Sequence, residues 1–499
     1  MKYRTLGIAA TAVMLIAAMT FSGFSSDHQT QRVHQHLTAR QPDAGCSCAG
    51  DELCTHLPLL IVDTAGVEIP GEPLSSDGTP LDQTDMEYEY TGVTLAADGS
   101  KTIVCSMAVI DNENGNNHPS DDPAITSTAR IRIRGNTSRL HDKKGYLIVT
   151  TEEDGLTNRD VELMGMDSHH EWALHGPYLD KSLIRNYMWY NIGGEIMDYA
   201  PNARFCEVIL NGEYQGLYVA VETITNGDGS RLSMSLPESD SQSSISYVIR
   251  LDRGSSSEIK NIETFSMYSL RTLNQIDIVY PGFSNLTEDR VAFIRQDFSD
   301  FEKSLYSYDY DTEPYAWWNQ ADLDSFAEYF LINEFTCNYD VGGRSTYMYK
   351  DVRGKYKMVI WDMNSCCNNF HNSYMEPQGF HLKGITWFTM LMRDETFVNR
   401  VIELYRELRD TYLSDEYLTS YIDSVVAYLG PATERNFEVW GYTFEEYRPL
   451  DPDSRNPQTY EDAVEQLREF CLERGAWMDE NVDTLLQFCH ESRNKKYNH

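Results

Sequence analysis

The strongest local constraint on the fold is a β-hairpin centred on Asn211-Gly212. The flanking segments, 205–210 and 213–221, are rich in β-branched and aromatic residues, as strands are. Asn-Gly suits a two-residue type I′ turn, because both of its central residues need a positive φ. The sequence therefore predicts antiparallel sheet in the first half of the chain.

Strand patterns also precede the hairpin, and helical patterns follow it. Residues 130–134 alternate polar and apolar side chains, the pattern breaks at Gly135, and a second strand is predicted over 145–150. A helix is predicted over 181–197, and after residue 285 apolar residues recur mainly at helical spacing. We therefore predict an α+β fold whose first half is β-rich and whose second half is mainly helical.

Two helix starts carry capping signals. Asp322 precedes an apolar helical pattern, and Thr459 with Asp462 three residues later forms a predicted capping box. The segment between the two predicted strands around Gly135 and the polar stretch over 223–244 are predicted loops. These signals place two helix starts in the second half of the chain and two loops in the first half, without saying how the elements pack.

The chain is too long for a single hydrophobic core, so several packed units are expected from its 499 residues. The composition is that of a globular protein, with an apolar fraction of 41%. We predict a signal peptide or N-terminal anchor over 1–30, a polar linker over 31–56, a β-rich unit over 57–125, a second β-containing unit over 126–250 and a mainly helical unit over 251–490.

The first residues have the layout of an export signal. The basic residues Lys2 and Arg4 precede an almost uncharged stretch over 6–24, which predicts a secreted or cell-surface protein. The apolar stretch is nearly long enough to span a bilayer, so an uncleaved N-terminal anchor is the alternative. Membrane contact is expected only through this segment.

The net charge of the chain indicates which classes of binding partner to expect. The formal net charge is −36, and Lys and Arg are not clustered, so nucleic acid is not an expected partner. Basic or metal-bridged partners fit an acidic surface better, although solubility alone also explains it.

Three cysteines near the N-terminus are candidate metal ligands. Cys46, Cys48 and Cys54 lie close to His56, but they lack the paired CxxC spacing of a zinc site. Local disulfides or idle thiols are the simpler expectation for an exported chain.

Two aspartates in the second half flank a predicted hairpin. The order is a helix, a loop with Asp340, two strands separated by 351–354, and Asp362. Phosphoryl transfer needs one carboxylate to orient the acceptor hydroxyl and another to hold the Mg²⁺ that bridges the phosphates. Protein kinases use this layout, although, taken alone, Asp340 is more simply explained as a turn cap and Asp362 as a strand end.

The first half offers cations and a glycine for phosphate binding. Lys143 and Lys144 both lie at the start of a predicted strand, and either can neutralise phosphates there. Gly135 lets the backbone approach a phosphate closely, although its surroundings match neither GxGxxG nor a Walker A loop.

Several short motifs occur together in a defined order. They are Arg134-Gly-Asn-Thr-Ser138, Lys143-Lys-Gly-Tyr146, Leu163-Met-Gly-Met166, Glu171-Trp-Ala-Leu174, Gly176-Pro-Tyr178, Asp180-Lys-Ser-Leu-Ile-Arg-Asn186, Leu210-Asn-Gly-Glu-Tyr-Gln-Gly-Leu-Tyr218 and Trp361-Asp362. This set resembles the CotH, or spore-coat-protein-H, family of atypical kinases over roughly residues 57–485.

The resemblance implies an atypical protein-kinase-like, two-lobed fold, with 126–250 as the β-rich N-lobe and 251–490 as the helical C-lobe. It implies transfer of the γ-phosphoryl group of ATP to Ser or Thr of an extracytoplasmic or spore-coat protein, with Mg²⁺ or Mn²⁺. The implied roles are Asp340 as catalytic residue, Asp362 and Asn364 as metal ligands, and Lys144, Arg134, Gly135 and Arg185 as the nucleotide-binding set.

Two departures from the family pattern leave alternatives open. Asn364 stands where many members have a second Asp, and Arg344 and Ser345 follow Asp340 where kinases have an Asn. The second metal ion is therefore in question. The competing function is a non-catalytic coat or surface interaction protein that keeps the kinase-like fold.

Overall fold

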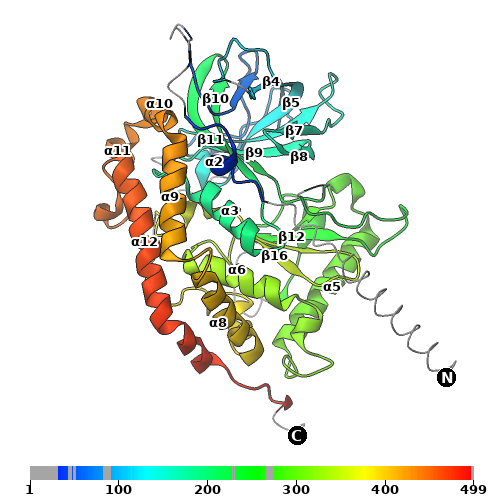
Figure 1. Cartoon of the computed structure of the whole chain (residues 1–499). Coiled ribbons are helices and arrows are strands. Elements are labelled where there is room, and N and C mark those ends of the chain that lie inside the picture. Colours follow the sequence, from blue (N-terminus) through cyan, green and yellow to red (C-terminus); the bar gives the residue numbers. More distant parts are fainter. Residues whose placement is uncertain are drawn as a thin grey trace, which may run out of the picture. The chain divides into compact units, whose positions relative to one another are not determined.

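Strands from the first half of the chain form a closed β-barrel in the computed structural model (Figure 1). The structure describes residues 32–42, 46, 48, 52–82, 91–113, 115–227, 229, 231–265, 275–371 and 373–495. The predicted signal segment over 1–30 lies outside these residues. The described residues from Val33 onward form one compact unit.

Seven strands close the barrel in the order β1-β10-β11-β9-β6-β5-β4. Neighbouring strands are antiparallel except β1 and β10, which pair in parallel. The barrel strands are β1 (Leu59–Asp63), β4 (Ile103–Ile110), β5 (Ile125–Arg134), β6 (Gly145–Thr151), β9 (Glu171–His175), β10 (Ala203–Leu210) and β11 (Glu213–Glu222).

The barrel joins two regions that the sequence suggested were separate units. Strands β1 and β4 come from 57–125, and the remaining strands lie almost entirely in 126–250. Burial alternates along β5, where Ile131 and Ile133 are buried and Arg132 between them is partly exposed on the opposite face. The predicted strands and the hairpin at Asn211-Gly212 are confirmed, with φ values of 52° and 81° at the turn.

A second, five-stranded antiparallel sheet carries the later strands in the order β13-β14-β12-β15-β16. Its strands are β12 (Tyr247–Asp252), β13 (Asn261–Ile262), β14 (Gln275–Tyr280), β15 (Thr346–Lys350) and β16 (Lys357–Val359). Two small pairs, β2 (Pro73–Leu74) with β3 (Gly92–Val93) and β7 (Val161–Leu163) with β8 (Met166–His169), lie outside both sheets.

Helices make up most of the chain after residue 285, as predicted, and α9 and α12 run beside each other (Figure 1). The helices are α2 (Gln35–Thr38), α3 (Arg185–Ile196), α5 (Glu288–Tyr306), α6 (Leu323–Phe335), α7 (Phe388–Leu391), α8 (Glu395–Arg409), α9 (Asp415–Leu429), α10 (Pro431–Trp440), α11 (Thr443–Glu446) and α12 (Tyr460–Asn481). The fold is α+β. In the described part of the chain, no helix has both the length and the apolar character required to cross a membrane.

Both predicted helix caps are present. The Asp322 side chain accepts a hydrogen bond from Ser325 N at the start of α6. Thr459 and Asp462 form the capping box that begins α12. Because capping depends on residues within one turn, it can be predicted locally.

The segment predicted as a linker packs against the rest of the protein where the structure describes it. Gln35 exchanges two hydrogen bonds with the backbone of Phe205 in β10, at 3.1 and 2.7 Å. The ring of His36 lies 2.9 Å from the hydroxyl of Tyr187 in α3. These anchoring side chains are polar and buried, so hydrophobic periodicity does not reveal them, and the linker interpretation does not hold for residues 33–42.

Candidate active site

Asp362 lies directly beyond the edge strand β16, in a left-handed conformation with φ of 60° and ψ of 54°. Its backbone N–H donates to the Tyr190 hydroxyl of α3 at 3.0 Å. The Ser345 hydroxyl donates to its carboxylate at 3.4 Å. Helix α3 and the loop before β15 therefore fix the orientation of Asp362.

Three carboxylates act on one another at this edge of the sheet. Burial and, to a smaller extent, the charge of Asp362 raise the pKa of Asp340 to about 6, while Arg344 and Arg253 oppose the change. Burial likewise raises the pKa of Asp362, Arg134 lowers it, and Asp252 raises it. Since mutual repulsion disfavours three ionised groups, the arrangement suits a bound cation.

Arg134 brings the barrel to this carboxylate group. It is the last residue of β5, and its guanidinium lies over the Trp361 ring at 5.4 Å from the centroid. The positive charge of Arg134 lowers the pKa of Asp362, so the arginine side chain acts on the same site. Gly135 follows with φ of 106°, and a Cβ there would collide with the Ser138 side chain. Only glycine fits this turn.

Asn364 lies in a short 3-10 turn, Met363–Ser365, just beyond Asp362. Its amide nitrogen donates to the Ser365 hydroxyl at 3.3 Å, while its buried carbonyl oxygen Oδ1 has no hydrogen-bond partner among the described residues. Buried polar atoms without partners are rare and call for a ligand or water. This amide oxygen and the Asp362 carboxylate, two residues earlier in the chain, are both oxygen donors of the type that Mg²⁺ prefers.

Backbone strain is concentrated in the same part of the chain. Of the eleven described non-glycine residues with positive φ, six lie between residues 337 and 368. They are Cys337, Ser345, Arg353, Asp362, Cys367 and Asn368. Such conformations cost free energy and occur preferentially at functional sites, where the surrounding structure enforces them.

The two lysines proposed for phosphate binding occupy different environments. Lys144 is partly exposed and pairs with Glu72 at 2.8 Å, and it also donates to the Arg139 carbonyl at 2.7 Å. Lys143 is buried, and its ammonium group donates to the Leu217 carbonyl at 2.7 Å and to Asn436 at 2.6 Å. Burial lowers the pKa of Lys143 well below its usual value.

Arg185, assigned to the nucleotide-binding set by resemblance, is buried at the start of α3. It forms an ion pair with Asp180 at 2.5 Å and donates through Nε to the Cys366 carbonyl at 3.2 Å. These contacts hold the chain just beyond Asp362 and Asn364. Arg185 therefore contacts the backbone of the site rather than extending its side chain into it.

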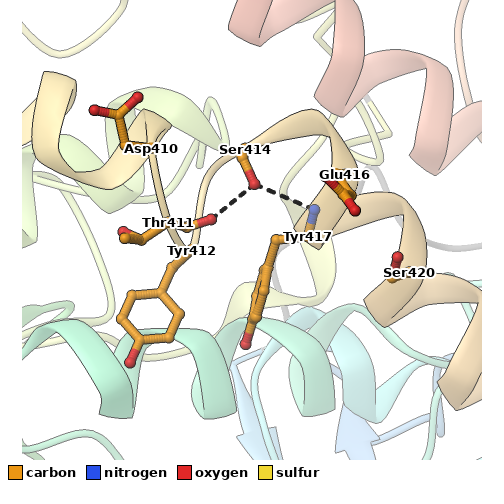
Figure 2. Close-up of a pocket in the computed structure, with 7 residues that line it drawn as sticks. All are labelled: Asp410, Thr411, Tyr412, Ser414, Glu416, Tyr417 and Ser420. Atoms are coloured by element: carbon orange, nitrogen blue, oxygen red, sulfur yellow. Dashed lines mark hydrogen bonds between the residues drawn. The ribbon is translucent and has the colours of Figure 1, made fainter.

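Glu195, near the end of α3, forms no ion pair with Lys143 or Lys144 in the part of the chain that the structure describes. Its carboxylate accepts from the Tyr412 hydroxyl at 3.1 Å and lies 2.9 Å from the His34 ring. Tyr412 and Tyr417 line an open hollow of about 520 Å³ at the start of α9 (Figure 2). In the described chain, the glutamate that pairs with Lys144 is instead Glu72.

Asp252 is a site residue that the sequence analysis missed. It ends β12, and its charge raises the pKa of both Asp340 and Asp362. Its carboxylate pairs with Arg253 at 3.4 Å. The sequence does show a carboxylate at the end of a strand-like run, which is one signal for a site residue. No nearby sequence pattern, however, indicates that β12 pairs with β15.

Residues 131–478 match the CotH kinase protein family, and because this match covers more than half of the chain, the protein belongs to that family. The chain is also similar to inner spore coat protein H of Bacillus subtilis (strain 168), with 20% identity over 260 residues. The alignment covers 51% of this chain and 65% of that protein, so the chain spans less than two thirds of this curated relative.

Proposed function

We propose that the protein transfers the γ-phosphoryl group of ATP to a Ser or Thr hydroxyl of another protein, with a two-lobed kinase-like arrangement of its barrel and helical parts. The observation that carries this proposal is the position of Arg134, at the end of barrel strand β5, over the Trp361 ring and within electrostatic reach of Asp362, just after β16 of the second sheet. Membership of a family described as kinases supports the same reaction class.

Asp362 and the unpartnered Oδ1 of Asn364 are the proposed ligands of a divalent cation. A divalent cation held there, Mg²⁺ or Mn²⁺, would neutralise the negative charge of the phosphates during transfer. The amide of Asn364 contributes an oxygen without a negative charge, so binding depends mainly on the Asp362 carboxylate.

Arg134, Lys144 and the Gly135 turn are the proposed phosphate-binding elements. The guanidinium can form two parallel hydrogen bonds with phosphate oxygens, and Lys144 adds a point charge from the neighbouring strand end. Gly135 permits close approach of the backbone. Arg185 has a positioning role here, because it holds the carbonyls of Cys366 and Cys367 behind the metal ligands.

Asp340 is the proposed catalytic residue. It orients the acceptor hydroxyl and takes its proton as the oxygen forms a bond to the γ-phosphorus, while the bond from phosphorus to the β–γ bridging oxygen breaks and ADP leaves. A pKa of about 6 leaves the group mostly ionised at neutral pH yet able to accept a proton.

The acceptor is proposed to be a Ser-rich protein of a spore coat or cell surface, in keeping with the similarity to an inner spore coat protein. Export through the segment over 1–30, with or without retention as an anchor, is part of this proposal. The net charge of −36 favours a basic or metal-bridged partner.

A non-catalytic interaction protein is the second possible function. The neutral Asn364 favours it, because loss of one carboxylate weakens a metal site. This alternative predicts specific binding to a coat or surface protein without phosphate transfer, so the two functions differ in a measurable product.

The first test is nucleotide binding by thermal shift. We expect Mg-ATP, but neither ATP nor Mg²⁺ alone, to raise the melting temperature by a few degrees, because a ligand of the native state stabilises it by about 2.7 kcal/mol at a hundredfold excess over Kd. The Asp362→Ala variant is expected to lose this shift. Replacement of the exposed Asp240 by Ala serves as the control.

Transfer itself is measured by incubating the protein with γ-labelled ATP and a panel of Ser-rich coat proteins. Label on an acceptor with the wild type and the Asp240→Ala variant, but not with Asp362→Ala, supports the kinase function. A metal-dependent shift without transfer favours the interaction protein. Absence of both the shift and transfer contradicts the nucleotide site.

A further inference from the structure

Three cysteines and one histidine converge at a place remote in sequence from the carboxylate site. Cys46, Cys48 and Cys54 precede β1, whereas His118 lies in the connection between β4 and β5. One ligand atom from each residue lies within 4.8 Å of all the others, and the four side chains are half-buried. The Cys46 sulfur lies 3.4 Å from His118 Nε2.

These separations match a tetrahedral metal centre. With Zn–S near 2.3 Å and Zn–N near 2.0–2.1 Å, ligand atoms around one zinc ion lie roughly 3.5–3.8 Å apart. Three cysteines and a histidine are an established ligand set for structural zinc, and thiolates favour zinc over Mg²⁺ or Ca²⁺.

The backbone brings two of the ligands together independently of any metal. Thr55 and Asn117 form an antiparallel bridge, with N–H to carbonyl distances of 3.1 and 2.6 Å. In this pairing Cys54 stands opposite His118. The Asn117 side chain adds a hydrogen bond to the Leu57 carbonyl at 2.8 Å. The site is therefore built on paired backbone rather than on a chance approach of side chains.

The surrounding polar groups are those that a metal ligand set requires. His118 Nδ1 lies 3.2 Å from the Asp121 carboxylate, which leaves Nε2 directed at the sulfurs. Asp121 is itself held by Asn112 at 2.7 Å and by the His118 N–H at 2.9 Å. The Asn116 amide donates to the Cys54 sulfur at 3.1 Å, a contact that stabilises a thiolate.

We propose that Cys46, Cys48, Cys54 and His118 bind one structural zinc ion. Four protein ligands complete the coordination, so the ion has no open position for substrate. Binding releases the thiol protons to solvent and fastens the segment before β1 to the β4–β5 connection. This proposal replaces the expectation of disulfides or idle thiols, because a disulfide would use only two of three convergent sulfurs and leave His118 without a role.

The test is the metal content of the full chain purified under reducing conditions. We expect elemental mass spectrometry to find one zinc ion per chain. When Co²⁺ replaces zinc, we expect the absorption spectrum to show thiolate-to-cobalt charge transfer and the visible bands of tetrahedral Co²⁺. Cys48→Ser and His118→Gln are expected to lose most of the bound metal. Asp121→Ala is expected to lower zinc affinity by about 10- to 100-fold.

Cys489→Ser is the matched control, because Cys489 is also partly buried but belongs to no such cluster in the described chain. It is expected to bind zinc as the wild type does. If the variants at Cys48 and His118 do not fold, the wild-type metal content and the cobalt spectrum decide. Reduced wild-type protein that takes up no zinc from added zinc chloride overturns the proposal. A disulfide would lower the intact mass of the native chain by two hydrogens. If such a mass is found, and peptide mapping places the disulfide at two of Cys46, Cys48 and Cys54, the zinc proposal is overturned.

Discussion

The Asp340→Asn variant is expected to transfer phosphate on the order of a hundredfold more slowly than the wild type, or slower still, while its nucleotide affinity stays close to the wild-type value. An amide of the same shape can still contact the acceptor hydroxyl, but it cannot take the proton. The measurements are single-turnover transfer and nucleotide titration. Equal transfer by the wild type and the variant would contradict the role of Asp340.

The stability of the Asp340→Asn variant, compared with that of the wild type, shows whether slower transfer is caused by unfolding. The pKa of Asp340 is raised to about 6 by burial and by Asp362, so the folded state holds the proton more tightly than the unfolded chain does. Stability is therefore lost as the pH rises from about 4 to about 6, and the penalty persists above that range. Asn carries no such penalty.

We therefore expect Asp340→Asn to be more stable than the wild type at pH 7.5 without metal, by at most about 3 kcal/mol, and similar to it near pH 4. Melting temperatures at the two pH values measure the difference. Slower transfer by a more stable variant cannot be attributed to unfolding. A variant that is less stable at pH 7.5 would show that Asp340 is not repelled in the folded state.

The Arg185→Ala variant is expected to lose about 3–5 kcal/mol of stability. Both members of the Asp180–Arg185 pair are buried, so removal of the guanidinium leaves a buried carboxylate without its counter-charge. The carbonyls of Cys366 and Cys367 also lose a donor. Thermal and urea denaturation measure this loss.

Two further variants separate a structural role of Arg185 from direct nucleotide binding. Arg134→Ala is expected to remain within about 1 kcal/mol of the wild type but to bind nucleotide more weakly. The double variant Asp180→Asn with Arg185→Ala is expected to lose less stability than the two single changes added together, because the two groups interact directly. An Arg185→Ala variant of wild-type stability with weakened nucleotide binding would support the nucleotide-binding role that the family resemblance implied.

Much of the local structure around the candidate site could be predicted. The alternation over 130–134, the Asn211-Gly212 turn and the order of helix, Asp340 loop, hairpin and Asp362 are all present in the structure. These features depend on periodicity, turn conformation and residues a few positions apart, which a sequence displays directly.

Other relationships required the tertiary structure. Asp252 acts on Asp340 only because β12 pairs with β15, and β1 completes the barrel by parallel pairing with β10, almost 150 residues away. The sequence could not distinguish the buried Lys143 from the more exposed Lys144. Nor could it show that His118, rather than the nearby His56, joins the three cysteines.

The sequence by itself thus determined the main strands and helices named above, the Asn211-Gly212 turn and the chemical types of most candidate site residues. Only the tertiary structure decided which of those residues meet, which are buried and which serve the scaffold. The physical reason is that pairing between distant strands and burial of polar side chains depend on the free energy of the whole packed chain. A residue such as Arg185 therefore looks the same in a local motif whether it contacts a ligand or an internal carboxylate.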